Sequence, residues 1–173
     1  MTATIVAFVP FNPALPRGDF DCGNEALNRW FRDQAGQQER RNNVRTHLGL
    51  ATFDSRIASF FSLVTHRIEL ADLASTAAFS SRLYPVPTML IANLAVDVRY
   101  QGVGVGGLTL WHALGLLAHS SKSVGFEAVL VDAIDEAAST FYRKYGFREL
   151  VDGGERLYLS TKTLLRSVEE SFE

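Results

Sequence analysis

A run of glycines separates two apolar stretches near the middle of the chain. Residues 89–96 before it have the character of a strand, and residues 108–117 after it have the character of a helix. Glycines at such a junction remove Cβ atoms that would keep a ligand off the backbone, so amide N–H groups and the helix N-terminus can receive a phosphate. The run therefore predicts a site for a cofactor with a pyrophosphate, and its candidate residues are Gln101, Gly102, Val103, Gly104, Val105, Gly106 and Gly107.

Two classes of cofactor fit this segment. Gly102, Gly104 and Gly107 satisfy the dinucleotide pattern G-x-G-x-x-G, but only about 70 residues follow, too few for the further βαβ units of such a domain. Gln101, Gly104 and Gly106 also give the pattern Q-x-x-G-x-G. This second pattern resembles the pyrophosphate loop of the GNAT acetyltransferases, which implies acetyl-CoA as the cofactor.

A second motif lies in residues 137–147, which read as a short helix ended by glycine and followed by a strand. It resembles the GNAT pattern A-x-x-F-Y-x-x-x-G-F. The resemblance implies that Tyr142 protonates the departing thiolate and that Ala138, Phe141 and Tyr145 lie beside the pantetheine arm. The competing interpretation is structural, with Tyr142 packing the helix against a sheet and Tyr145 in the core.

Composition narrows the class of protein. The chain has 173 residues, 47% hydrophobic and 21% charged, which suits a single domain over residues 1–173. A single cysteine, Cys22, excludes an internal disulfide and a cysteine-rich zinc site, and the histidines have no metal-binding spacing, so no metal site is expected. With neither a signal-peptide pattern nor an 18-residue apolar run, we expect a cytoplasmic protein without a membrane partner.

The order of expected elements gives the fold class. We expect a strand at 3–9, a helix from Asn24 to about Arg41, a β-hairpin of 44–53 with 57–64, and a small helix or loop at 70–80. The central strand 89–96, the glycine loop, a helix to about Ser120, a strand 128–133, the tyrosine helix and a hairpin across 152–155 follow. This order predicts an α+β protein with a mixed central sheet flanked by helices, in the manner of the GNAT fold.

The N-terminal third narrows the family. Phe20, Cys22, Gly23, Leu27 and Trp30 match an F-x-C-G-x-x-x-L-x-x-W opening, and residues 94–102 contain L-A-V-D-x-x-Y-Q-G. Both segments resemble the GNAT toxins of type II toxin–antitoxin systems. The resemblance implies acetylation of the α-amino group of aminoacyl-tRNA, a homodimer, a ribbon-helix-helix antitoxin, and contact with operator DNA through the antitoxin complex only.

One position departs from the family pattern. These toxins commonly carry arginine directly before L-A-V-D, whereas this chain has Asn93. Asparagine offers a neutral amide where arginine would place a fixed charge near the substrate. Asn93 is therefore a candidate substrate residue that affects the choice of substrate.

The residues also suggest how the reaction proceeds. If the central strand splays from its neighbour, the backbone groups of Leu94, Ala95 and Val96 become free to hold pantetheine and to polarise the thioester carbonyl. Tyr142 suits a proton donor because a phenol stays protonated at neutral pH. A strong base is unnecessary for an α-amine, which titrates at about pH 7.7–8.0, in contrast to a lysine side chain at about 10.4.

A basic cluster runs through the N-terminal helix region. Arg40, Arg41 and Arg45 are candidate contacts for tRNA phosphates. The alternatives are a solvated helix face, since Asp33 and Glu39 lie in the same run, or a surface for the antitoxin. His47 lies among apolar residues of an expected strand and is a further, weaker candidate for facing substrate.

Two alternatives to a translation-blocking toxin stay open at this point. The first is an acetyltransferase for a small-molecule or protein amine on the same scaffold. The second is a binding module without catalysis, which holds acyl-CoA or an antitoxin with operator DNA.

Overall fold

The structure, a computed structural model, describes residues 6–73 and 75–172. It contains two compact units. The first comprises the chain up to Val64 together with Ala92–Ala113, and the second comprises Thr65–Ile91 and the chain from Leu114 onward. The single domain expected over residues 1–173 stays a prediction.

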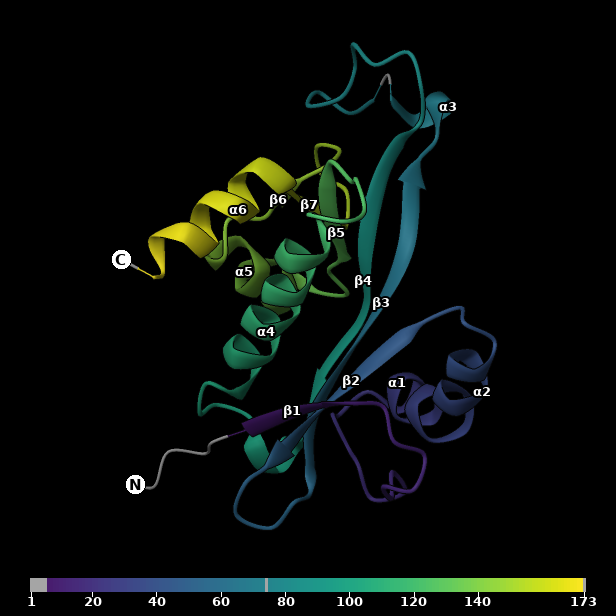
Figure 1. The fold of residues 1–173 in the computed structure, drawn as a ribbon, viewed down its shortest axis with the longest axis vertical. Coiled ribbons are helices and arrows are strands. Elements are labelled where there is room, and N and C mark those ends of the chain that lie inside the picture. The colour runs from purple at the N-terminus through teal and green to yellow at the C-terminus, as the bar shows by residue number, and fades with distance from the viewer. Residues whose placement is uncertain (1–5, 74, 173) are drawn as a thin grey trace. The chain divides into compact units, whose positions relative to one another are not determined.

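The first unit contains an antiparallel sheet built from β1, Val6–Pro10, β2, Arg45–Ala51, and the first part of β3, which begins at Ile57 (Figure 1). β2 and β3 form the expected hairpin, with Leu48 opposite Phe60. The first strand is confirmed from Val6 and extends to Pro10, and residues 3–5 of the prediction lie outside the described residues.

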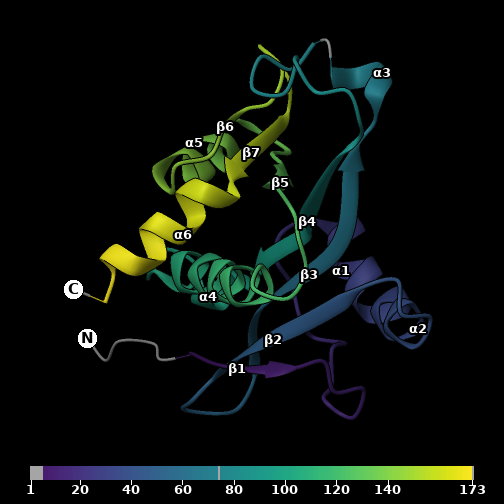
Figure 2. The same cartoon turned by 45° about the horizontal axis from the view of Figure 1, so that its top comes forward.

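The expected helix from Asn24 to Arg41 is not one uniform α-helix. Asn24 caps α1, Glu25–Arg29, by accepting the Leu27 N–H at 3.1 Å. A π-helical turn, Trp30–Gln34, follows, and α2, Ala35–Arg40, completes the segment beside β2 (Figure 2). The prediction was wrong at this turn, where the Ala35 N–H bonds to the Trp30 carbonyl five residues back.

Aromatic packing fixes the helical segment on the sheet of this unit. Phe31 is fully buried and stacks on Phe60 of β3, with ring centroids 4.0 Å apart and planes at 9°. Phe20 meets both rings edge-on, at 5.0 Å and 5.4 Å. Ala95 of β4, the strand Val86–Val96, is buried in the same cluster. The N-terminal motif and the central strand therefore share one core.

The second unit contains the first part of β4 and the strands that follow it in the sequence, hydrogen-bonded in the order β4-β5-β7-β6. β4, Val86–Val96, pairs in parallel with β5, Ala128–Asp132, and β5 pairs antiparallel with β7, Arg156–Ser160. β6, Arg148–Glu149, forms the expected terminal hairpin with β7. Parallel and antiparallel pairs together make the sheet mixed, as predicted.

Several boundaries differ from the prediction. β3 continues to Ile68 rather than ending near Val64, and β4 begins at Val86 rather than Met89. The region 70–80 holds the short helix α3, Leu70–Leu73, as the expectation of a small helix or loop allows. Both strands run longer because buried neighbours such as Ile68 and Val86 join an apolar cluster with Ala128 and Leu130, which local pattern does not reveal.

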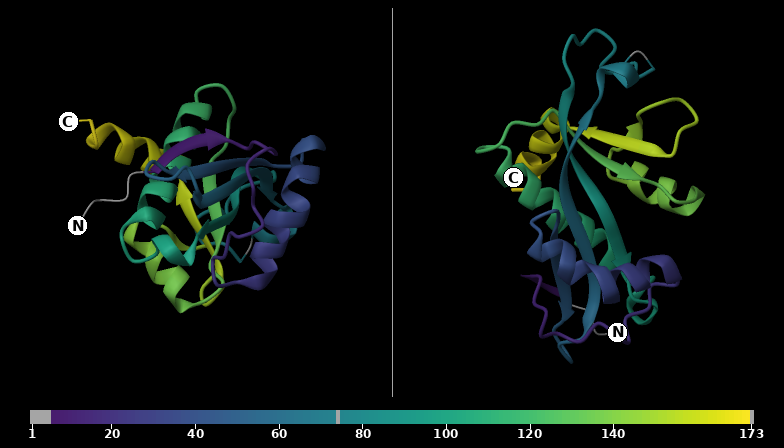
Figure 3. Two further views of the ribbon diagram at one scale, coloured as in Figure 1. Left: turned by 90° about the horizontal axis from the view of Figure 1, so that it is seen from below. Right: turned by 90° about the vertical axis from the view of Figure 1, so that its right-hand side faces the viewer.

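The longer helices confirm the α+β class. α4, Val105–Ser120, follows the glycine loop, and α5, Glu136–Lys144, is the tyrosine helix. α6, Thr161–Glu170, was not predicted and follows β7 directly, capped by the Ser160 side chain (Figure 3). Among the helices of residues 6–73 and 75–172, none is long and apolar enough to span a membrane.

Candidate functional site

The glycine loop has the backbone conformation that its sequence suggests. Gly102 and Gly104 have φ angles of +75° and +90°, which residues other than glycine rarely adopt. A Cβ atom added at either position would meet nothing within 4 Å. Backbone conformation, not crowding by the protein, therefore requires these glycines, and the space beside them is open to a ligand.

The loop ends in the first turn of α4. Val105 is fully buried against Ala51 and Ala58, and this contact anchors the helix start. Gly106 and Gly107, counted with the loop from the sequence, lie in the first turn of this helix. The first amides of a helix lack intrahelical acceptors and carry the positive end of its dipole, so this turn can receive an anion.

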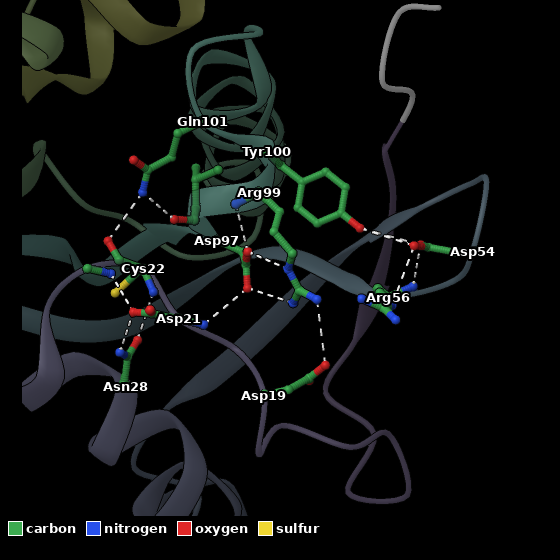
Figure 4. Close-up of polar contacts among 12 residues, drawn as sticks. Asp19, Asp21, Cys22, Asn28, Asp54, Arg56, Asp97, Arg99, Tyr100 and Gln101 are labelled. Carbon is green, nitrogen blue, oxygen red and sulfur yellow. Dashed lines mark hydrogen bonds and ion pairs between the residues drawn. The ribbon is translucent and has the colours of Figure 1, made fainter.

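Gln101 uses its side chain to hold the loop. Its Nε2 donates to the Val96 carbonyl at 2.8 Å and to the Cys22 carbonyl at 3.2 Å (Figure 4). Both amide hydrogens are thereby engaged within the protein. The part that Gln101 takes in cofactor binding stays a prediction, and its observed part is to set the position of the loop.

Asp97 is the centre of a buried network at the end of β4. Its carboxylate is fully buried and accepts the backbone N–H groups of Asp21, at 3.0 Å, and Arg99, at 2.9 Å. Arg99 adds a bidentate contact, in which Nε donates at 2.8 Å and Nη2 at 2.9 Å (Figure 4). Burial by itself would raise the pKa of Asp97, but these hydrogen bonds outweigh it and leave the pKa below its usual value.

The Asn28 side chain holds residues 21–23 of the N-terminal motif together through hydrogen bonds. Asp21 Oδ1 accepts the Gly23 N–H at 2.8 Å and Asn28 Nδ2 at 2.9 Å, and the Cys22 N–H donates to Asn28 Oδ1 at 2.9 Å. The Val98 N–H donates to the Asp21 carbonyl at 2.8 Å. Two motifs far apart in the sequence are thus joined in one hydrogen-bonded structure, which the sequence did not reveal.

The end of β4 carries Asn93, Leu94, Ala95 and Val96. The parallel pairing with β5 covers Thr88–Ile91, and β4 continues beyond it to Val96. Ala95 is buried, and Asn93 and Leu94 are half-buried. The Val96 carbonyl accepts one hydrogen bond from Gln101 and keeps a second lone pair. The binding roles of all four residues stay predictions.

Tyr142 lies in the second unit, on α5. Its side chain is 7% exposed and its ring packs edge-on against Phe141 at 5.2 Å and near Phe147 at 5.6 Å. Burial, with a smaller contribution from the charge of Asp132, raises the pKa of Tyr142 to about 12. The hydroxyl therefore stays protonated at neutral pH, as a proton donor requires.

The other predicted residues of this motif lie on α5 or, for Tyr145, at its C-terminal cap. Phe141 and Tyr145 are half-buried, with ring centroids 5.3 Å apart. The Ala138 N–H is used in the helix cap, where it donates to Asp135 Oδ1 at 2.7 Å. The cofactor roles of all three residues stay predictions.

A polar chain that the sequence did not predict lies on the strands of the second unit. Arg156 of β7 binds the Asp132 carboxylate through Nε at 2.7 Å and Nη2 at 2.9 Å. Its Nη1 lies 3.1 Å from His66 Nε2, and His66 Nδ1 lies 3.1 Å from the buried Thr88 hydroxyl. Because arginine only donates, His66 Nε2 accepts and Nδ1 carries the hydrogen. No local pattern marks these residues, which become neighbours through strand pairing.

The basic residues of the first unit differ from one another. Arg45 contacts Asn42 Oδ1 at 2.6 Å, the Glu39 carbonyl at 3.2 Å and the Glu39 carboxylate at 3.6 Å, so it ties β2 to the end of α2. Arg40 and Arg41 have exposed side chains. His47 stacks on Phe61 at 5.0 Å, and burial followed by the charge of His112 lowers its pKa.

Comparisons with known proteins agree with these features. No family model matches the chain. A tRNA-acetylating toxin of Mycobacterium tuberculosis (strain ATCC 25618 / H37Rv) is 30% identical over 128 residues, which are 74% of this chain and 75% of that protein.

Two solved structures carry the same fold. The toxin AtaT complexed with acetyl-methionyl-tRNAfMet matches with a TM-score of 0.82 and 26% identity, over 97% of this chain and 99% of that one. A mutant of AtaT bound to the C-terminus of the antitoxin AtaR and to acetyl-CoA matches with a TM-score of 0.80 and 24% identity, over 94% and 98%. The predicted GNAT toxin fold is confirmed, and the chain belongs to the family of tRNA-acetylating toxins.

Proposed function

We propose that this protein transfers the acetyl group of acetyl-CoA to the α-amino group of an aminoacyl-tRNA and so removes that tRNA from translation. The observation that carries the proposal is the 30% identity to a tRNA-acetylating toxin over three quarters of both chains. The open glycine loop and the buried Tyr142 supply the chemistry that this reaction needs. An acetylated amine cannot attack the peptidyl ester, so elongation from that tRNA stops.

The glycine loop is the proposed pyrophosphate site. Gly102 and Gly104 leave open space beside a helix N-terminus, where backbone N–H groups can receive the negative charge of a diphosphate. The buried Val105 and the two hydrogen bonds of Gln101 hold the loop in position. When bound, acetyl-CoA supplies the acetyl group as an activated thioester.

Tyr142 is the proposed general acid. The acceptor nitrogen forms its bond to the carbonyl carbon as the bond from that carbon to sulfur breaks. Tyr142 gives its phenolic proton to the departing sulfur, and the proton lost by the nitrogen restores the phenol through solvent. The raised pKa of Tyr142 keeps the phenol protonated until the thiolate forms.

The acceptor is proposed to be an α-amine because its ordinary pKa of about 7.7–8.0 leaves a substantial neutral fraction at neutral pH. Arg40 and Arg41 are proposed to contact the tRNA backbone. The protein is further proposed to work in the cytoplasm as a homodimer, and to be neutralised by a ribbon-helix-helix antitoxin that carries the complex to operator DNA. An AtaT structure with the C-terminus of its antitoxin supports a partner of this general kind.

Mass spectrometry of total aminoacyl-tRNA tests the function. After incubation with the protein and acetyl-CoA, we expect one or a few aminoacyl groups to gain an acetyl group. Tyr142→Phe should lower kcat by about 10²–10⁴-fold, since one proton donor is lost. Calorimetry should show that this variant binds acetyl-CoA normally. No acetylated aminoacyl-tRNA with the wild-type protein would overturn the proposed function, and equal kcat values would remove Tyr142 from it.

Gly104→Glu tests the cofactor loop by itself. The carboxylate would enter the open space and repel a diphosphate, so the affinity for acetyl-CoA should fall by about tenfold or more, equivalent to about 1.4 kcal/mol. Gly104→Asn is the matched control, because asparagine tolerates a positive φ and adds no charge. Normal affinity in a folded Gly104→Glu variant would place the diphosphate elsewhere.

A further inference from the structure

Asp132 ends β5, three residues before the Asp135 cap of α5, and its negative charge contributes to the raised pKa of Tyr142 on that helix. Its side chain is 51% exposed although Arg156 binds both carboxylate oxygens. Each oxygen accepts one N–H from Arg156 and keeps a second lone pair. The carboxylate is thus held in one orientation and can still accept hydrogen bonds from a ligand.

The support behind Asp132 extends over several strands. Arg156 uses its third nitrogen, Nη1, to donate to His66 Nε2 at 3.1 Å, and His66 is anchored to the buried Thr88 hydroxyl. Burial, and then the charge of Arg156, lowers the pKa of His66, so this ring stays neutral. Arg156 therefore has little freedom to turn away from Asp132.

The proposed reaction brings a hydrogen-bond donor to this place. Tyr142 protonates the sulfur that leaves the carbonyl carbon, and the acceptor amine attacks that same carbon. The amine therefore comes within a few ångströms of the tyrosine hydroxyl as it reacts. An amine carries N–H donors, and Asp132 is the acidic group whose charge reaches Tyr142.

From this juxtaposition we propose that Asp132 accepts a hydrogen bond from the α-amino group of the aminoacyl substrate, with Arg156 and His66 as positioning residues. The inference rests on the proposed function and adds a substrate contact to it. Arg156 has a second effect. Its positive charge offsets that of Asp132, so the pair orients the amine without strongly stabilising the unreactive ammonium form.

The pH dependence of kcat separates this role from a structural one. The titratable and charged groups that interact with Asp132 are the Arg156 guanidinium, the neutral His66 ring and the Tyr142 phenol, and Glu69 acts on His66. The acid limb of kcat reports deprotonation of the bound amine, whereas kcat/KM reports the free reactants. In Asp132→Asn, loss of the negative charge should lower the pKa of the bound amine and move the acid limb of kcat down by about half a pH unit or more. In Arg156→Gln, the uncompensated carboxylate should move it up.

A matched control comes from the other end of the same strand. Glu127 directly precedes β5 and forms an ion pair with Arg82, and both side chains are partly exposed. Glu127→Gln removes the same charge as Asp132→Asn, away from Tyr142. We expect its pH profiles for kcat and kcat/KM to match the wild type. Thermal unfolding should show that all three variants are folded.

The expected result is opposite shifts of the acid limb of kcat in Asp132→Asn and Arg156→Gln, with the kcat/KM limb unmoved. Coincident kcat profiles in folded variants would overturn the inference. If Asp132→Asn is too slow to profile, an unshifted limb in Arg156→Gln overturns it equally. An amino acid methyl ester offers the same α-amine without tRNA. The pH profile of kcat measured with this ester therefore tests the Asp132 contact even if the protein does not acetylate aminoacyl-tRNA.

Discussion

Two aspartate–arginine pairs have almost the same geometry and opposite surroundings. In the first unit, Asp97 and Arg99 meet through contacts of 2.8 Å and 2.9 Å, and in the second unit Asp132 and Arg156 meet at 2.7 Å and 2.9 Å. Asp97 has no exposed surface and accepts two backbone N–H groups as well, whereas the Asp132 side chain is 51% exposed. The geometry of the aspartate–arginine contact therefore does not distinguish a structural pair from a ligand-binding one. What distinguishes them is whether the carboxylate keeps lone pairs that a ligand can reach.

The largest expected difference between the pairs is in stability. Asp97→Ala leaves a guanidinium and two N–H groups without their acceptor inside the protein, so the free energy of unfolding should fall by about 3–5 kcal/mol. Asp132→Ala removes a half-exposed ion pair and should cost less than about 1 kcal/mol. Urea unfolding measures both values. Equal losses would erase the distinction between a structural and a functional pair.

The arginines of the first unit sharpen the same comparison, with a smaller effect. Arg45 is engaged by Glu39 and Asn42, whereas Arg40 and Arg41 are exposed. Replacing Arg40 and Arg41 by glutamate should weaken tRNA acetylation and reduce the slope of log affinity against log salt by about one for each lost phosphate contact.

Arg45→Gln is the control for this pair. It should lower stability with little change in the salt slope, because its charge is already partly balanced by Glu39. Acetylation of a small amine should change little in either variant. A normal salt slope after both exposed arginines are reversed would assign them to a solvated face or to an antitoxin contact.

Acid unfolding gives the smallest expected difference. The pKa of Asp97 is lowered in the folded protein, so its contribution to stability is fully present above the unfolded pKa of about 3.9 and is lost as the pH falls through the lower folded value. Asp97→Asn should therefore show a shallower loss of stability below about pH 4 than the wild type. Asp132→Asn should change this slope less, because solvent screens its charge. Parallel curves for all three proteins would contradict the assigned role of Asp97.

Local chemistry explains which parts of the fold were predictable. Gly102 and Gly104 predict a loop because few other residues adopt a positive φ. The alternation of apolar and polar residues in 44–64 predicts a hairpin. The helix around Tyr142 ends at Lys144, and the φ of +91° at Gly146, just after the Tyr145 cap, matches the expected glycine stop.

The unpredicted parts depend on residues distant in sequence. Asp132, His66 and Arg156 become neighbours only when their strands pair, and each one alone looks like a surface charge or an isolated histidine. Gln101 matched a motif, but its bonds to Val96 and Cys22 depend on where the N-terminal segment lies. The motif identified the position correctly without revealing what its side chain does.

The π-helical turn at Trp30–Gln34 has a consequence for the direction of the residues after it. An α-helix advances about 100° around its axis with each residue, so one extra residue in a turn rotates everything downstream by about that angle. Deleting a single residue from this turn would restore regular winding while leaving Phe31 in reach of Phe60. Arg40 and Arg41 would then point about a quarter-turn away from their present direction. The direction in which the Arg40 and Arg41 side chains point is therefore set by the π-helical turn that begins ten residues before Arg40.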